Sequence, residues 1–379
     1  MSKTAKLHIN IEPELKETAE EVLAEMDLNV SQAIRLFLKQ VVLTREIPFF
    51  FYYQVEEIQD IKVKKMHYKK VNPPFNYIGG KSWLKDKLRA KVKQQLNNNK
   101  ITAYCEPFCG GLGAFLSVYD ILYNNNIKTV FLNDINAKLI NFYEVVNNNL
   151  TELVECYIKI EQQFFKLTDK KALDKHKTND KEELKTILSK NNDFYNDIVN
   201  KYNTANLADH KIELASYLLF LLTHCYNGLY RENSQGKFNA AYNWEVKHIT
   251  KHQINSKLSS LNEVFSMFNI VFSCENFDKL DYIDTCLYYL DPPYLNEKGT
   301  ENKYNNCSFN YSNQKLLLET IKNKHFIYSN YYSAEIVELV NEVLLLVDVD
   351  IVERLNVFSA DPETRNEVKQ EVIISSKKH

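Results

Sequence analysis

The sequence predicts an α/β protein with an open sheet, a mainly helical insertion, and a small N-terminal unit of one strand and two helices. Short apolar runs at 101–104 and 129–132 are each followed by a helical pattern, which is typical of parallel α/β sheets. From about 150 to 215 the chain is rich in Lys, Asn and Asp, with apolar residues at helical spacing. Residues 7–11 alternate in polarity, and two amphipathic helical patterns follow them.

Composition and charge limit the classes of function. The 379 residues are 45% hydrophobic and 25% charged, as expected for a globular protein of two or three domains. A net charge of −2 means that any contact with nucleic acid must be local. The apolar runs are shorter than the roughly 20 residues that span a bilayer, and the alternating start does not resemble a secretory signal. Seven cysteines without a C-x-x-C pair favour reduced thiols in the cytoplasm and no metal site.

Residues 1–50 form the first predicted unit. Leu7, Ile9 and Ile11 place one apolar face on a short strand, Pro13 opens a helix, and Ser31 caps a second helix. One strand and two helices cannot bury much apolar surface alone. We therefore expect this unit to form a homodimer by pairing its strand with a second copy.

This stretch, from residue 9 to residue 50, closely resembles the ribbon-helix-helix domain of RelB-type antitoxins. In that family the paired strands enter the DNA major groove, and the amide ends of the second helices hold phosphates. The resemblance implies that Lys6, His8 and Asn10 face the groove, with Ser31 near a phosphate. The alternative is that residues 1–50 only dimerise or bind a protein partner. Residues 51–72 follow as a linker with a basic end.

Glycine is scarce, so its positions are informative. Only 8 glycines occur, and three short segments hold seven of them. The central segment, Glu106–Gly113, lies between a strand and a helix, as in a nucleotide-type ligand site of an α/β sheet. It lacks the full G-x-G-x-x-G spacing and no Walker lysine follows, so neither NAD nor ATP is the natural ligand. Asp134, about twenty residues further on, stands where an acidic side chain typically receives ribose hydroxyls, and it could also cap the next helix.

Two other segments add to this site. Gly79 and Gly80 precede a helix and form a turn that a ligand can approach closely, with Lys81 as a positive charge, although such a turn is more often an ordinary loop. The segment Asp291–Tyr294 ends an apolar strand in two prolines, which cannot continue a sheet ladder. The Asp291 carboxylate, the Pro292 carbonyl and the Tyr294 ring would surround one point. Two acceptors and an aromatic face suit the exocyclic amine of a flat base.

Residues 75–81, 106–113 and 291–294 occur in the order and approximate spacing of Dam-type (D12 class) DNA N6-adenine methyltransferases, and the resemblance covers nearly all of 73–376. It implies a Rossmann-like fold that binds S-adenosylmethionine, with a catalytic domain at 73–150 and 270–379 and a target-recognition domain at 151–269. Double-stranded DNA is the implied partner, and no metal is required.

By this resemblance Tyr77 and Lys81 contact the cofactor, Asp134 holds its ribose, Asp291 holds its amino-acid portion and the target amine, and Tyr294 stacks on a flipped adenine. The implied catalytic residues are Asp291, Pro292, Pro293 and Tyr294. The implied cofactor-binding residues are Tyr77, Gly79, Gly80, Lys81, Glu106, Pro107, Phe108, Gly110, Gly113, Asp134 and Asp291.

The segment from 225 to 239 is similar to the family's hairpin that enters the duplex. By resemblance, Tyr226 and Asn227 occupy the space left by the flipped base, and Leu229 and Arg231 read neighbouring bases, with Asn233 also in contact with DNA. The alternative is a surface hairpin with a glycine-containing turn. Residues 240–243 and 223 depart from relatives that methylate GATC, so the target sequence is in doubt, and GATC or a related short site is the leading prediction.

Three alternatives to this function stay open. N4-cytosine methylation uses the same chemistry, but its enzymes often carry Ser in place of Asp291, and the same Asp disfavours RNA or protein methylation. A DNA-binding transcriptional regulator with an inert or secondary methyltransferase module is an alternative of another class. A cognate restriction enzyme is a possible partner of a site-specific methyltransferase.

Overall fold

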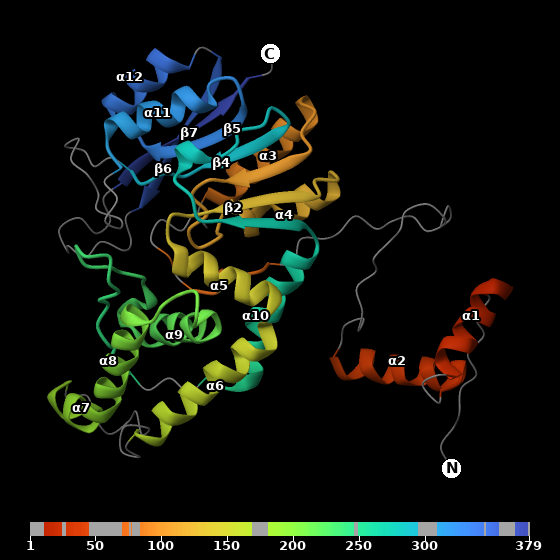
Figure 1. Cartoon of the computed structure of the whole chain (residues 1–379). Coiled ribbons are helices and arrows are strands. Elements are labelled where there is room, and N and C mark those ends of the chain that lie inside the picture. The colour runs from red at the N-terminus through yellow and green to blue at the C-terminus, as the bar shows by residue number, and fades with distance from the viewer. Residues whose placement is uncertain are drawn as a thin grey trace. The chain divides into compact units, whose positions relative to one another are not determined.

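The computed structural model describes residues 11–24, 28–44, 70–75, 77, 84–168, 181–245, 249–294, 309–344, 346–355 and 368–377. The chain divides into two compact units, 1–64 and 65–379, and each is described by itself (Figure 1). None of the described helices is long and apolar enough to cross a membrane.

The N-terminal unit contains two helices, α1 (Pro13–Ala24) and α2 (Val30–Thr44). The prediction that Ser31 caps the second helix is wrong, because α2 begins at Val30. Asn29 caps it instead, because Asn29 Oδ1 accepts from the Gln32 amide at 2.9 Å and Gln32 Oε1 accepts from the Asn29 amide at 2.8 Å. The expected strand lies almost wholly outside the described residues.

The described part of the second unit is built on one seven-stranded sheet in the order β3-β2-β1-β4-β5-β7-β6. Strands β1 to β5 pair in parallel, whereas β7 is antiparallel to both β5 and β6. The strand predicted from residue 101 begins two residues later. The strands are β1 (Ala103–Glu106), β2 (Thr129–Asn133), β3 (Asn269–Ser273), β4 (Cys286–Leu290), β5 (His325–Tyr331), β6 (Val347–Leu355) and β7 (Val368–Ser376).

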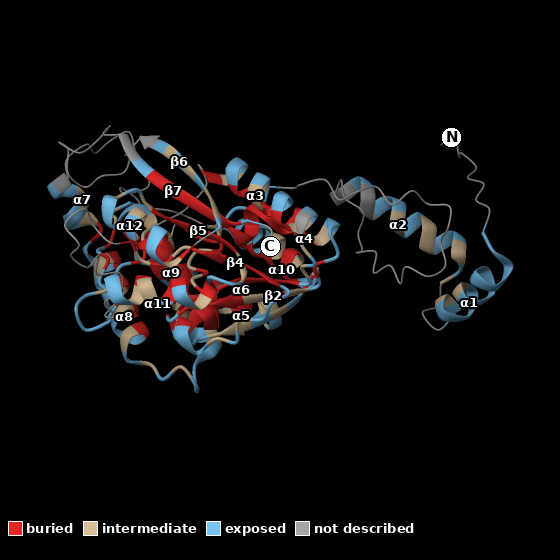
Figure 2. Cartoon of the chain, turned by 90° about the horizontal axis from the view of Figure 1, so that it is seen from above, coloured by how far each residue is buried: buried red, intermediate tan, exposed pale blue. Residues whose placement is uncertain are grey.

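Side chains of the central strands alternate between two apolar layers, as strand periodicity requires. Tyr104 and Tyr289 pack into the layer that holds α3, α4, α5 and α10. Cys105 and Tyr288 pack into the layer that holds α11 and α12. Figure 2 shows the buried strands between exposed helix faces. The covering helices are α3 (Lys85–Asn98), α4 (Phe115–Asn124), α5 (Ala137–Asn148), α10 (Lys251–Ser266), α11 (Tyr311–Ile321) and α12 (Ala334–Val343).

A helical group lies between α5 and α10 in the sequence and contains α6 (Leu150–Lys166), α7 (Lys181–Ile187), α8 (Ser189–Thr204) and α9 (Lys211–His224) (Figure 1). Helix α9 is buried on most sides, because Leu214, Leu218 and Leu221 each expose 1% or less. Its apolar core is continuous with the α5 side of the sheet. A hairpin follows α9, joined by the bridges Cys225–Tyr242 and Glu232–Phe238.

Candidate active site

Parallel pairing of β1 with β2 and β4 brings three sequence-distant segments to one edge of the sheet. Each strand ends at that edge, and the glycine segment, Asp134 and the Asp291–Tyr294 turn follow them. The carboxyl edge of an open parallel sheet is where ligands bind in α/β proteins. The predicted catalytic and cofactor segments that the structure describes therefore meet here.

The glycine loop is held close to the end of β2. The Cys109 amide donates to the Asn133 carbonyl at 2.8 Å, and the Gly110 amide donates to Asp134 Oδ2 at 3.0 Å. Gly110 has φ of 43°, in the region that favours glycine. Tyr77 lies against the loop, since a Cβ at Gly111 would come within 2.7 Å of the Tyr77 Cβ.

Asp134 braces this loop. Its Oδ1 accepts from the Asn136 amide at 3.0 Å while Oδ2 holds Gly110. The helix-cap alternative for Asp134 is wrong, because Asn136 caps α5 by accepting from the amides of Lys138 and Leu139. Burial raises the pKa of Asp134, and the two amide donors oppose the rise. Ribose binding by Asp134 stays a prediction.

Glu106 is a buried acid at the end of β1, with 1% of its surface exposed. The Tyr104 hydroxyl donates to Glu106 Oε1 at 2.7 Å. Burial raises the pKa of Glu106 to about 8; the hydrogen bond from Tyr104 opposes this rise, and the charge of Asp291 adds to it. Glu106 is therefore largely protonated at neutral pH, close to a second carboxylate.

The Asp291–Tyr294 turn is held by side chains that the motif itself does not include. Ser329 Oγ donates to Asp291 Oδ1 at 3.0 Å, and Gln314 Nε2 donates to the Pro293 carbonyl at 3.0 Å. The Tyr294 hydroxyl donates to Glu371 Oε2 at 3.1 Å. Pro292 and Tyr294 are buried, and Tyr294 exposes only 8% of its surface.

An aromatic cluster adjoins the glycine loop. The ring of Phe108 lies 5.8 Å from that of Phe277 and 5.6 Å from that of Phe309, and the last two rings are 5.4 Å apart. Sequence reasoning missed Phe309, which has no motif around it. Flat rings beside acidic side chains fit a cofactor that combines an adenine, ribose hydroxyls and cationic groups. Phe108, Phe277, Asp134, Asp291 and Glu106 could hold such a molecule.

The predicted DNA-contacting residues differ in exposure. Tyr226 exposes 63% of its surface and Arg231 is exposed, while Leu229 is half-buried. Asn227 has φ of 59°, within a tight turn in which the Gly228 amide donates to the Cys225 carbonyl near the base of the hairpin. Asn233 has a local role, because its Oδ1 accepts from the amides of Gln235 and Lys237 and closes the hairpin turn.

Tyr230 links this hairpin to the glycine loop, and sequence reasoning missed it. Its ring stacks on Tyr77 with centroids 5.8 Å apart and an interplanar angle of 22°. Its hydroxyl donates to Glu232, which faces Lys138 of α5. No local sequence pattern marks Tyr230, because its partner Tyr77 is distant in the sequence.

Several predicted site residues lie outside the described residues. They are Lys6, His8, Asn10, Gly79, Gly80 and Lys81.

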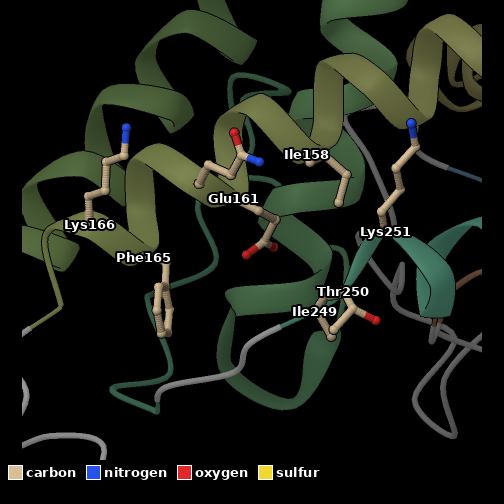
Figure 3. Close-up of a pocket in the computed structure, with 8 residues that line it drawn as sticks. Ile158, Glu161, Phe165, Lys166, Ile249, Thr250 and Lys251 are labelled. Atoms are coloured by element: carbon tan, nitrogen blue, oxygen red, sulfur yellow. The ribbon is translucent and has the colours of Figure 1, made fainter.

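A surface cavity of about 360 Å³ lies elsewhere, between α6 and the start of α10 (Figure 3). Ile158, Phe165 and Ile249 line it, with Lys166 and Lys251 also contributing. None of the predicted site residues contributes to its lining, so it is separate from the candidate active site.

The approach of Tyr77 to Gly111 generates a first prediction. Gly111→Ala forces Tyr77 to move, so we expect S-adenosylhomocysteine to bind at least about tenfold more weakly, as judged by calorimetry. Gly236→Ala is the control, because Gly236 belongs to the hairpin turn and its positive φ of 70°, which Gly111 lacks, makes an alanine there strained as well. Wild-type affinity in Gly111→Ala would contradict the packing role of Tyr77.

The raised pKa of Glu106 generates a second prediction. The pKa of Glu106 is 4.5 in the unfolded chain and about 8 in the folded protein, so the folded protein keeps this proton to a higher pH. The folded state thus binds more protons between these values, so this group lowers the free energy of unfolding as pH rises, by at most about 1.4 kcal/mol per pH unit.

Urea unfolding from pH 5 to pH 8 checks this dependence. We expect Glu106→Gln to flatten the slope relative to wild type, whereas Glu152→Gln, at an exposed position of α6, keeps the wild-type slope. Identical slopes for Glu106→Gln and wild type would show that Glu106 ionises normally in the folded protein.

Comparisons with known proteins identify the family of the chain. Residues 77–355 match the D12 class N6 adenine-specific DNA methyltransferase family, and residues 4–72 match the RelB antitoxin family. The type II methyltransferase M.MjaIII of Methanocaldococcus jannaschii is 28% identical over 64% of this chain and 77% of its own length. The DNA adenine methylase of Haemophilus influenzae is 24% identical over 70% of this chain and 77% of its own length. The chain thus belongs to the D12 class of N6 adenine-specific DNA methyltransferases.

Proposed function

We propose that this DNA adenine methyltransferase transfers a methyl group from S-adenosylmethionine to N6 of an adenine flipped out of duplex DNA, in GATC or a related short site. The observation that carries the proposal is the meeting of the glycine loop and the Asp291–Tyr294 turn at the ends of the neighbouring strands β1 and β4. A base inside a duplex cannot reach such a site, which is why the target must leave the stack.

Asp291 and the Pro292 carbonyl activate the adenine amine. That amine is a poor nucleophile, because its lone pair is delocalised into the ring. Hydrogen bonds from the amine to these two acceptors favour a tetrahedral nitrogen and stabilise the charge that develops there. The hydrogen bond from Ser329 to Asp291 Oδ1 orients the carboxylate for this role. Asp291 need not act as a strong base.

The cofactor side of the site is acidic. Bound S-adenosylmethionine supplies a methyl group on a sulfonium sulfur, which is a good leaving group. Asp134 and Asp291 lie near the glycine loop, and their carboxylates favour a cationic ligand, whose charge would also favour ionisation of Glu106. The remaining task of the protein is to align the amine, the methyl carbon and the sulfur.

The hairpin is the proposed DNA-reading element. Tyr226 and Asn227 occupy the gap left by the flipped base, and the exposed Arg231 pairs with a guanine. Two of the departures from GATC-methylating relatives point inward: Thr223 Oγ1 donates to the Leu219 carbonyl within α9, and Tyr242 exposes 3% of its surface. Since Tyr242 pairs with Cys225 at the base of the hairpin and Thr223 is bonded within α9, these two departures are compatible with an unchanged GATC target.

The N-terminal unit is proposed to dimerise the enzyme and add a second DNA contact. Helix α1 has no buried residue, and Leu15, Val22 and Leu36 each expose 48% or more of their surface. Apolar faces of this kind need a partner, and a second copy of this unit supplies one. Such a dimer could raise the effective concentration of the enzyme near a DNA site.

The match of residues 4–72 to the RelB antitoxin family favours a second candidate, a DNA-binding regulator with a secondary or inert methyltransferase module. The complete Asp291–Tyr294 turn and its buried supports argue against inertness. Relatives named type II methyltransferases make a cognate restriction enzyme a further proposed partner.

The proposed reaction is tested by long-read sequencing of unmethylated genomic DNA after incubation with the protein and S-adenosylmethionine. We expect N6-methyladenine confined to one short motif. Asp291→Ala should abolish turnover but keep much of the DNA affinity, while Asp284→Ala, an exposed acid paired with Lys324, should remain active. Modified cytosine, or an active Asp291→Ala variant, would overturn the assignment.

The proposed dimer is tested by equilibrium sedimentation. We expect the full chain to sediment as a dimer and a variant without residues 1–64 to sediment as a monomer, because the second unit has its own core. If both proteins sediment with the same oligomeric state, the N-terminal unit does not dimerise the enzyme.

A further inference from the structure

Side chains on both faces of β5 hold the Asp291–Tyr294 turn. One face contacts side chains of the turn, and the other is linked to its backbone. Ser329 and Tyr331 lie two residues apart on the strand and therefore face the same side of the sheet. Ser329 donates to Asp291 at 3.0 Å, and the Tyr331 ring meets the Tyr294 ring edge-on, with centroids 4.6 Å apart and an angle of 72°. One face of β5 thus contacts both chemically important side chains of the turn.

The opposite face of β5 holds the turn's backbone. The Tyr328 hydroxyl donates to Gln314 Oε1 at 2.8 Å, which leaves the Gln314 amide to donate to the Pro293 carbonyl at 3.0 Å. Asn330 Nδ2 donates to the Tyr328 hydroxyl at 2.6 Å. Gln314 is fully buried, so this chain of hydrogen bonds is shielded from water.

Glu371 completes the arrangement from β7. It stands directly opposite Tyr331 in the antiparallel register, so the two side chains lie on the same face and contact Tyr294 from neighbouring positions. Burial raises the pKa of Tyr294 well above its usual range, and the charges of Asp291 and Glu371 add to this rise. The phenol therefore stays protonated and donates its hydrogen bond to Glu371.

Burial of a carboxyl group at this position costs folding free energy, so its presence indicates a functional role. Glu371 exposes 1% of its surface and is followed in β7 by the buried Val372, Ile373 and Ile374. An apolar residue would suit that strand better by burial alone. A local departure from core chemistry of this kind is expected at a functional site.

We propose that Glu371 is a positioning residue, which fixes the ring of Tyr294 in the orientation needed to stack on the target adenine. The ring edge contact with Tyr331 limits sliding, and the hydrogen bond at the far end of the phenol limits tilting. Glu371 touches neither substrate nor cofactor in this role. The inference rests on the proposed function, because it assigns Tyr294 to the flipped base.

Steady-state kinetics of four variants test the inference: Glu371→Gln, Glu371→Leu, Tyr294→Phe, and the double variant Tyr294→Phe/Glu371→Leu. Removing the hydrogen bond in Glu371→Leu or Tyr294→Phe should lower kcat about tenfold, with the KM for S-adenosylmethionine unchanged. Glu371→Gln should recover most of the rate, because its amide oxygen still accepts from the phenol. The double variant should be no slower than either single variant.

Tyr282→Phe is the matched control, since Tyr282 precedes β4 in the sequence, at the end of that strand opposite to the turn, and its ring packs on Tyr288 instead of on Tyr294. Its kcat should equal that of wild type. If Glu371→Leu does not fold, Tyr294→Phe still decides the question, because it removes the same hydrogen bond while keeping the ring.

The outcomes separate the two proposals. An active wild type with unchanged kcat in Tyr294→Phe, or losses that add in the double variant, overturns the positioning role alone. A parallel rise in the KM for S-adenosylmethionine would indicate general damage to the site and would also overturn it. A wild type that binds S-adenosylhomocysteine but methylates no DNA overturns the proposed function, and the base-positioning role with it.

Discussion

Parallel pairing of β1, β2 and β4 is the constraint on which the rest of the site depends. Because these strands run in the same direction, the segments that follow them emerge at one edge of the sheet, although Glu106 and Asp291 are far apart in the sequence. The same geometry places two carboxyl groups close together in a buried environment. One result is the raised pKa of Glu106. A cationic methyl donor, as proposed, would be stabilised by the charge of Asp291 and would favour ionisation of Glu106.

The parts of this arrangement that could be predicted from sequence are those with local signals. The glycine loop, the two prolines after an apolar strand and the helices of 150–215 each have a pattern within a few residues. Glu371, Gln314 and Tyr230 have no such pattern, since each acts through a partner that is distant in the sequence. The cap of α2 was misassigned for a related reason, because Asn29 and Ser31 are both good cap residues and only the reciprocal bond with Gln32 decides between them.

The hairpin and the glycine loop both contact Tyr77. Tyr77 packs on the glycine backbone on one side and stacks on Tyr230 on the other. Leu229 and Arg231, which flank Tyr230, are less buried than Tyr230, as their proposed contact with DNA requires. In the proposed function, base reading and methyl transfer would therefore use adjoining side chains, and substitutions at the exposed positions would alter base reading without disturbing Tyr230.

The central claim is that the methyl group reaches N6 of adenine. Mass spectrometry of nucleosides, from duplex DNA incubated with the protein and methyl-deuterated S-adenosylmethionine, tests it most directly. The account predicts that the deuterated methyl group appears in N6-methyldeoxyadenosine alone. Label in a cytosine nucleoside, or label in protein with none in DNA, would contradict it.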